Sequence, residues 1–196
     1  MTNVEGPDSS AAQPATVARP IRIFVGLSIA PCIAGELAVI ARQLEDLHVR
    51  LIAPADIHLT LVPPWEVPAA DDAIARLRSV AKDFKPFLLT VQRVCYGPQP
   101  RRPRLLWAEC ADSDELVALR AALLGAYGQS DARPYRPHVT LARLRDRAMT
   151  VVRAHPIDET LSLSQPVESV GLFQSPPPGE AGYKVLASAP LSGAPQ

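Results

Sequence analysis

The chain has 196 residues, of which 47% are hydrophobic, and its 20 basic and 20 acidic side chains give a formal net charge of zero. This length suits one domain or two small lobes that share a core. No apolar run approaches the ~20 residues that span a membrane, and a neutral chain lacks the overall positive charge that drives sequence-independent binding to nucleic acid. The sequence therefore favours a globular protein that does not enter a membrane.

Hydrophobic periodicity predicts alternating strands and helices after a disordered tail at residues 1–19, which is rich in Ala, Ser and Pro. Continuous or alternating apolar residues indicate strands around His58 and His138 and over residues 22–29, 87–96, 104–110, 161–173 and 183–187. Apolar residues three or four apart indicate helices over residues 31–47, 69–81, 113–127 and 149–154. Proline accounts for 21 residues, which fits many short connections and argues against a helical bundle.

These elements predict an α/β (α+β) domain over residues 20–189, followed by a loose tail at residues 190–196. We expect a first lobe at about residues 20–96, completed by the C-terminal strands, and a second lobe at about residues 97–160. Pro63 and Pro64 follow the His58 strand, and because proline lacks the amide donor of a strand ladder they are expected to stop regular pairing.

Cysteine usage and the first residues bear on the cellular compartment. Cys32, Cys95 and Cys110 are odd in number, lie in or beside apolar stretches and lack the spacing of a metal or redox motif. We therefore expect buried free thiols in a reducing compartment. No basic segment followed by an apolar core precedes the domain, so we expect no secretory signal and a cytoplasmic location.

Two matching tetrapeptides dominate the sequence, His58-Leu59-Thr60-Leu61 and His138-Val139-Thr140-Leu141. Side chains alternate faces along a strand, so the histidine and threonine of each copy share one face while the apolar residues point the other way. Each copy follows a predicted strand and helix, so the order strand, helix, His-x-Thr strand occurs twice. Two equivalent lobes that face each other across a cleft would each contribute one His and one Thr.

Two facing histidines suit acid–base chemistry near neutral pH. An ordinary imidazole has a pKa of ~6.5, so one ring can remove a proton while the other, protonated, delivers one. In-line displacement at phosphorus needs this arrangement, with threonine hydroxyls hydrogen-bonded to the phosphate oxygens. A strained cyclic phosphate is a natural substrate because its ring opens without a metal. Zinc bound by both histidines is an alternative, but no third ligand stands at the expected spacing.

Basic and aromatic residues surround the second motif. The arginines are Arg133, Arg136, Arg143, Arg145 and Arg147. They fit either a solvated rim or a phosphate-attracting edge. Arg136, Tyr135 and Trp65 are candidates for a substrate rim, the aromatic rings by stacking on a base. Strict alternation puts Arg143 on the face opposite His138, so we leave it out of the catalytic set unless a bulge intervenes.

These residues resemble the two-histidine phosphoesterases, especially the bacterial and archaeal RNA 2′,3′-cyclic phosphodiesterases, also called 2′-5′ RNA ligases. The resemblance spans roughly residues 20–189 and is carried by residues 57–61 and 133–143, with strands 21–29 and 182–186 in support. It implies a bilobal fold with two pseudo-symmetric lobes, whose antiparallel-rich sheets line a central cleft. It further implies hydrolysis of a cyclic phosphate to a 2′-phosphate without metal or cofactor.

Carried over by position, the resemblance makes His58 the general acid and His138 the general base, with Thr60 and Thr140 binding the phosphate. The implied partners are RNA ends or nucleotides that bear a cyclic phosphate, and we expect a monomer. Val62-Pro63-Pro64-Trp65 stands where the RNA enzymes usually carry phenylalanine-leucine-glycine, so RNA, a mononucleotide and ADP-ribose cyclic phosphate all stay open as substrates. The alternatives are 2′-5′ ligation by reversal and a nucleotide- or RNA-end-binding module without turnover.

Overall fold

Nine strands form one sheet in the computed structural model, which describes residues 19–99, 101–145, 148–177 and 180–193. The strands are β1 (Ile21–Ser28), β2 (Val49–Leu51), β3 (His58–Val67), β4 (Phe87–Gly97), β5 (Leu105–Cys110), β6 (His138–Leu144), β7 (Glu159–Val167), β8 (Ser169–Gln174) and β9 (Lys184–Pro190). The helices are α1 (Pro31–Ala41), α2 (Asp71–Ala81), α3 (Asp114–Ala126) and α4 (Ala148–Ala154), with 3-10 turns at Arg42–Leu44 and Pro54–Asp56.

Local sequence signals set several helix boundaries. Pro31 occupies the first turn of α1, where its missing amide hydrogen costs no hydrogen bond. The Ser113 hydroxyl caps α3 by accepting a hydrogen bond from the Leu116 amide at 3.2 Å, and Asp114 and Glu115 follow in the positively polarised first turn. Three helices lie within two residues of their predicted bounds, whereas α1 ends at Ala41, six residues before the predicted end at Leu47, and a 3-10 turn follows it.

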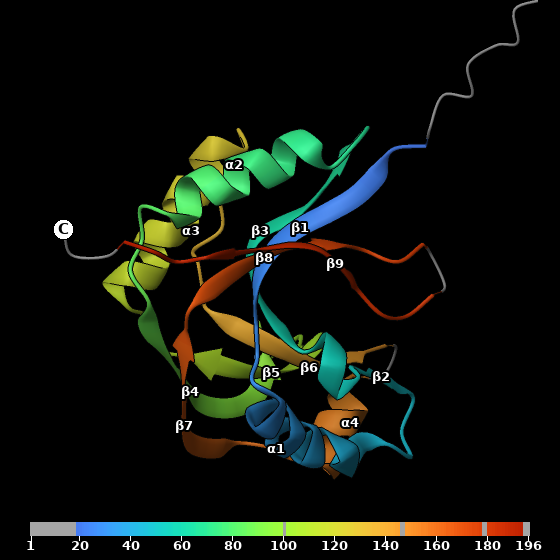
Figure 1. Ribbon diagram of the computed structural model, residues 1–196. Helices are drawn as coiled ribbons and strands as arrows, with labels where there is room; N and C mark the ends of the chain where they lie inside the picture. The colour runs from blue at the N-terminus through green and yellow to red at the C-terminus, as the bar shows by residue number, and fades with distance from the viewer. Residues whose placement is uncertain (1–18, 100, 146–147, 178–179, 194–196) are drawn as a thin grey trace, which may run out of the picture.

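The sheet is arranged symmetrically about β3 and β6. Its strand order is β7-β4-β5-β6-β3-β1-β8-β9, with β2 also paired to β6, and the paired strands are antiparallel. α2 contacts α3, β8 and β9, and α3 contacts β3, whereas α1 contacts β6 (Figure 1). Each half of the sheet thus has its own helical cover, and the predicted antiparallel-rich α+β fold is confirmed.

The two halves are not consecutive segments of the chain. β4 falls within the predicted first lobe but lies beside β5, in the half that holds His138. The stretch 161–173, predicted as one strand, is two strands that belong to opposite halves, and the chain crosses between them at Glu168. Gln165 joins the halves, since its side chain accepts from the Ala30 amide and donates to the Ser28 carbonyl. Its amide is satisfied despite burial, as a core polar group must be.

The C-terminal segment 190–193 is more ordered than the sequence predicts. Leu191 is buried, and its amide donates to the Glu168 carbonyl, while the Gly193 amide donates to Phe84. The segment 190–193 is therefore held in place where the sequence predicts a loose tail. The predicted disordered tail lies outside the described residues except for Arg19, as do residues 194–196.

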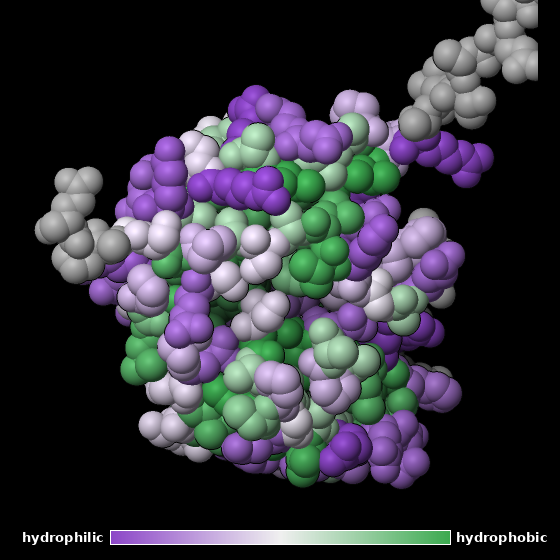
Figure 2. All heavy atoms as spheres, in the orientation of Figure 1, coloured by the Kyte–Doolittle hydropathy of each residue, from purple (hydrophilic) through white to green (hydrophobic). Residues whose placement is uncertain are grey.

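The surface of the protein carries many hydrophilic side chains and includes one of the cysteines. The three cysteines are free, as predicted, but Cys32 is exposed in the first turn of α1. Among the helices that the structure describes, none has the length and apolar composition needed to span a bilayer. Figure 2 shows hydrophilic side chains along much of the outline of one face, over α2 among other places, with apolar side chains nearer its middle.

Gly26 lies where β1 closely approaches β3, and its replacement should destabilise the fold. It pairs with Thr60 of β3 and with Gly171 of β8, and an added Cβ would stand 2.7 Å from the Leu59 carbonyl oxygen. Gly26→Ala should therefore force β1 away from β3 and lower the free energy of unfolding by about 1–3 kcal/mol.

Urea titration followed by circular dichroism measures the effect of Gly26→Ala. Gly35→Ala is the matched control, because a Cβ there meets nothing within 4 Å and alanine favours the helix. An unfolding midpoint for Gly26→Ala equal to that of the wild type would contradict the close approach of β1 and β3.

Candidate active site

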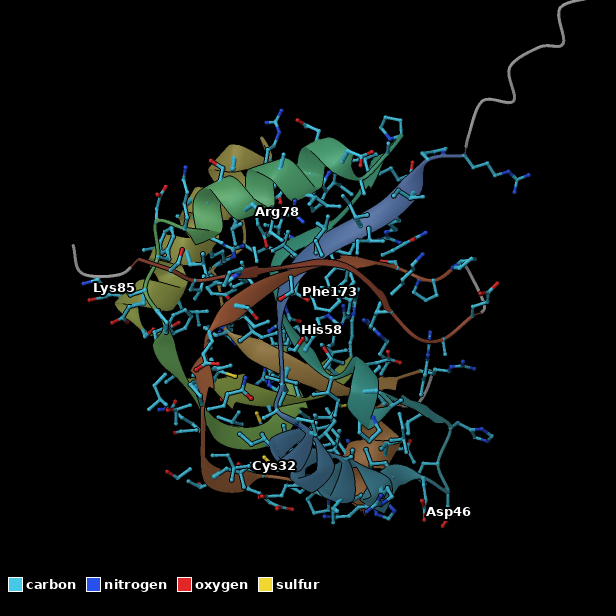
Figure 3. All side chains as sticks on the ribbon, in the orientation of Figure 1. Cys32, Asp46, His58, Arg78, Lys85 and Phe173 are labelled. Atoms are coloured by element: carbon cyan, nitrogen blue, oxygen red, sulfur yellow. The ribbon has the colours of Figure 1, made fainter. Side chains whose placement is uncertain are left out.

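β3 and β6, the strands that carry the two His-x-Thr motifs, lie side by side at the centre of the sheet. Leu59 pairs with Val139, and both side chains are fully buried. In an antiparallel register this pair sets His58 opposite Thr140, and sets Thr60 opposite His138. The four polar side chains share the other face, and Figure 3 shows His58 between the two halves of the molecule.

Each histidine is oriented by the backbone just before it. Nδ1 of His58 donates to the Asp56 carbonyl at 2.7 Å, and Nδ1 of His138 donates to the Arg136 carbonyl at 2.7 Å. A carbonyl only accepts, so the hydrogen of a neutral ring must sit on Nδ1. Nε2 of each ring is then left as the reactive atom, basic when the ring is neutral and acidic when it is protonated.

Aromatic rings enclose both histidines. The ring of His58 lies 4.7 Å from Phe24 and 4.9 Å from Tyr183 between centroids, and His138 lies 4.4 Å from Trp107. Phe173 lies near His58 as well (Figure 3), and the centroids of the two rings are 6.1 Å apart. These contacts fix the imidazole planes and exclude water from one side of each ring.

Burial lowers the pKa of both histidines below the ordinary value of 6.5. The hydrogen bonds from Nδ1 to the backbone oppose this shift, and so do the nearby carboxylates, Asp56 beside His58 and Glu109 beside His138. Positive charge at Arg143 lowers the pKa of both rings further.

A β-bulge explains why Arg143 faces the histidines. Trp107 of β5 pairs with Thr140, but Leu106 pairs with Ala142, so Leu141 is an extra residue in β6. Leu141 and Ala142 are both buried, and alternation resumes with Arg143 exposed on the face of His138 and Thr140. The bulge that the sequence leaves open as the exception to strict alternation is therefore present, and it puts Arg143 on the histidine face; periodicity alone does not reveal an inserted residue.

β3 contains the same bulge after its own threonine. Gly26 pairs with Thr60 while Val25 pairs with Val62, which leaves Leu61 as the extra residue. Pro63 then stands at the position equivalent to Arg143, so the half with His138 alone supplies an arginine there. A second register shift falls at Pro63 and Pro64; the prolines interrupt the ladder, but β3 continues to Val67.

A pocket of about 540 Å³ opens beside His138 and Thr60. Its wall includes Tyr135, whose ring lies 4.2 Å beneath the guanidinium of Arg120. Nη2 of Arg120 also forms an ion pair with Asp131 at 3.1 Å, and both side chains are largely buried. The pocket thus combines aromatic surface with fixed charge, a composition that suits a nucleoside.

The predicted rim residues differ in where they lie. Tyr135 and Arg136 line the pocket, and Arg136 donates from Nη1 to the Pro98 carbonyl at 3.3 Å. Trp65 is not among the lining residues; it packs against Tyr127 with ring centroids 4.8 Å apart. The register shifts in β3 separate Trp65 from the face of Thr60.

Sequence reasoning missed Arg120, Asp131 and Trp107. Arg120 lies on α3 and reaches the pocket only through the packing of that helix, so no local pattern marked it. Trp107 lies beside His138 because β5 pairs with β6, and the sequence does not reveal which strands pair. Within the described residues, no group of three or more His, Cys, Asp or Glu side chains has the arrangement of a metal site.

Residues 33–175 match the model of the 2′-5′ RNA ligase superfamily. The chain belongs to the 2′-5′ RNA ligase superfamily. The family predicted from the two motifs is confirmed.

Curated members of the superfamily resemble the chain over most of its length. An RNA 2′,3′-cyclic phosphodiesterase of Bacillus subtilis is 30% identical over 161 residues, which cover 77% of this chain and 86% of that protein. A protein of the same name from Archaeoglobus fulgidus is 24% identical over 131 residues, or 64% of this chain and 73% of the relative.

Solved structures share the fold of this superfamily member. A protein of Thermus thermophilus superimposes with a TM-score of 0.74 at 21% identity, covering 88% of this chain and 98% of that one. E. coli LigT in complex with NADP+ superimposes with a TM-score of 0.69 at 24% identity, covering 89% of this chain and 99% of LigT. The bilobal fold expected from the resemblance is therefore confirmed.

Proposed function

We propose that the protein hydrolyses the 2′,3′-cyclic phosphate of an RNA end or a nucleotide to a 2′-phosphomonoester. One observation carries this proposal: two histidines on adjacent antiparallel strands, each held through Nδ1 by a backbone carbonyl, with Nε2 free for chemistry. The curated relatives that carry the name RNA 2′,3′-cyclic phosphodiesterase support it.

The proposed reaction is an in-line displacement at phosphorus. Nε2 of neutral His138 takes a proton from a water molecule, and the water oxygen forms a new bond to phosphorus. The bond from phosphorus to the ribose 3′ oxygen breaks, and Nε2 of protonated His58 gives its proton to that oxygen. One ring gains the proton and the other loses it, and the 2′-phosphate is released.

Threonine and arginine side chains would stabilise the charge that develops on phosphate. Thr60 stands opposite His138 and Thr140 opposite His58, so each hydroxyl flanks one proton-transfer group and can donate to a non-bridging oxygen. After the bulge Arg143 lies on the face of β6 that carries His138 and Thr140, and its guanidinium adds a full positive charge. The acid–base step needs no metal ion, and we expect EDTA to leave turnover unchanged.

The pocket beside His138 would receive the nucleoside that carries the cyclic phosphate. Its volume of about 540 Å³ lies in the range of small-ligand sites. The ring of Tyr135 and the paired Arg120 and Asp131 offer stacking and hydrogen bonding to a base. Both histidines and the pocket come from one chain, so the site is complete in a monomer.

A substrate panel tests the proposal. The purified protein is incubated with a short RNA ending in a 2′,3′-cyclic phosphate, with cyclic mononucleotides and with ADP-ribose cyclic phosphate, and products are separated by chromatography. Hydrolysis of at least one of them supports the assignment and identifies the substrate class. Tight binding without any product would instead favour a binding module.

Removing one threonine hydroxyl should weaken turnover without affecting the fold. Thr60→Val and Thr140→Val keep the volume and strand preference of the side chain but delete its donor. We expect each to lower kcat/KM by about tenfold to a hundredfold. Thr90→Val is the matched control, because Thr90 sits on β4, where its hydroxyl bonds that of Ser164. Unchanged kcat/KM in both motif variants would remove the threonines from the mechanism.

The lowered histidine pKa values predict an acid-shifted pH profile. One ring must be neutral and the other protonated, so kcat/KM peaks between their two pKa values. Both values lie below 6.5 in the free protein, which places the optimum below pH 6.5. A bound phosphate anion stabilises the protonated rings, so the kcat profile should lie at higher pH than that of kcat/KM. A kcat/KM optimum well above pH 7 would contradict the lowered pKa values of the two histidines.

A further inference from the structure

A second pocket, rich in arginine, adjoins the candidate active site. It has a volume of about 580 Å³ and lies between the β4–β5 connection and the start of α4. Four arginines line it, together with the side chain of Met149. These are Arg101, Arg102, Arg104 and Arg145. We call it the arginine pocket.

The arginine pocket lies next to the pocket beside His138. Pro98 and Gln99 line both, so the two share one wall. The Pro98 carbonyl also accepts the hydrogen bond from Arg136, which lines the His138 pocket. A ligand long enough to leave the first pocket over this wall enters the second.

Backbone hydrogen bonds hold the β4–β5 connection in place. The Arg102 amide donates to Gln99 at 3.0 Å, and the Arg104 amide donates to Gly97 at 2.8 Å. The Leu144 amide then donates to the Arg104 carbonyl at 2.8 Å, which ties the connection to the end of β6. The backbone at Arg102 and Arg104 is therefore hydrogen-bonded, and Arg104 is tied to the strand that carries His138.

The described lining of the arginine pocket is strongly positive, although the chain has zero net charge. No acidic side chain is among its described lining residues, and within the described ranges the ion pairs involve other arginines. All four side chains are exposed. Guanidinium groups bind phosphate through paired donors, so this surface suits a chain of phosphodiesters more than a single anion.

We propose that the arginine pocket binds the phosphodiesters on the 5′ side of an RNA whose cyclic phosphate lies at the histidine pair. The inference rests on the proposed function and specifies its substrate as an oligonucleotide. A cyclic mononucleotide has no further phosphodiester and ends before the shared wall. Contacts to phosphate position RNA without reading its sequence, so the selectivity is for length and not for base.

The test compares two triple variants with equal loss of charge. Arg101→Ala/Arg102→Ala/Arg104→Ala removes three cations from the arginine pocket. Arg78→Ala/Lys82→Ala/Lys85→Ala removes three exposed cations on and after α2, none of which lines either pocket; Figure 3 labels Arg78 and Lys85. Unfolding midpoints confirm that both variants fold. For each we measure kcat/KM on a cyclic mononucleotide and on a pentanucleotide with a cyclic phosphate, and the affinity for a fluorescent pentanucleotide with a 3′ hydroxyl.

We expect the arginine-pocket variant to lose at least about tenfold in affinity for the pentanucleotide and in kcat/KM on the RNA, with hydrolysis of the mononucleotide unchanged. With three phosphate contacts, raising salt from about 50 to about 200 mM should weaken wild-type RNA binding about 20-fold, and much less in this variant.

Equal RNA affinity in the two triple variants would overturn the proposal. If the wild type hydrolyses neither of these substrates nor ADP-ribose cyclic phosphate, the proposed function fails. The pentanucleotide affinities then still decide whether the arginine pocket binds RNA.

Discussion

Replacing either His58 or His138 with alanine should lower kcat by about 10²–10⁴-fold, the contribution of a positioned general acid or base. The reason is geometric: each ring presents Nε2 at a fixed orientation because its Nδ1 is held by a backbone carbonyl. The two rings act in one step, so the double variant should be little worse than the more damaging single one. Initial rates on the best substrate of the panel measure the loss.

His48→Ala is the matched control, because His48 is exposed between α1 and β2 and should be dispensable. Circular dichroism and unfolding midpoints of the variants separate lost chemistry from lost structure. Full activity in His58→Ala or His138→Ala would rule out the two-histidine mechanism.

The assignment of acid and base needs a separate measurement. A substrate with a p-nitrophenolate leaving group departs without a proton, so losing the general acid costs little on that substrate. We expect His58→Ala to recover most of its activity on a 3′-deoxynucleoside 2′-(p-nitrophenyl phosphate), in which p-nitrophenolate replaces the 3′ oxygen as leaving group and no neighbouring hydroxyl can attack, whereas His138→Ala stays impaired. The opposite pattern would exchange the two roles while leaving the pair intact.

Arg143→Gln should lower kcat/KM by about 10²–10³-fold, the effect of losing one donor to the charge of a transition state. A second consequence distinguishes it from a general loss of packing. Arg143 lowers the pKa of both histidines, so its removal raises both values and moves the kcat/KM optimum to higher pH. The full pH profile of the variant measures both effects.

Arg143→Lys keeps the charge and loses the paired donors of the guanidinium. We expect it to retain the wild-type pH optimum while recovering part of the lost kcat/KM. A Gln variant with wild-type kcat/KM and an unshifted optimum would contradict the placement of Arg143 on the histidine face.

The central features of the site follow from sequence pattern. His58 and His138 each sit in a His-x-Thr stretch after a strand and a helix, and the structure brings those two strands together. Period-two alternation correctly separates the buried Leu59 and Val139 from the polar face. A doubled pattern is informative because chance rarely repeats both a motif and its structural context.

The errors arise where the chain departs from regular geometry or where distant segments meet. One inserted residue, Leu141, reverses the predicted face of Arg143, and register shifts in β3 leave Trp65 against Tyr127 instead of the pocket. The stretch 161–173 reads as one strand because apolar residues recur on both sides of Glu168, in two segments that join opposite halves of the sheet. Neither bulges nor partners across the sheet leave a local periodic signal.

The most direct test of the central claim is the identity of the product that the wild-type protein forms from an RNA ending in a 2′,3′-cyclic phosphate, in the presence of EDTA. The two-histidine account predicts a terminal 2′-phosphate, formed as fast with EDTA as without it and abolished in His58→Ala/His138→Ala. A 3′-phosphate, or turnover that stops with EDTA and returns with added metal, would contradict it.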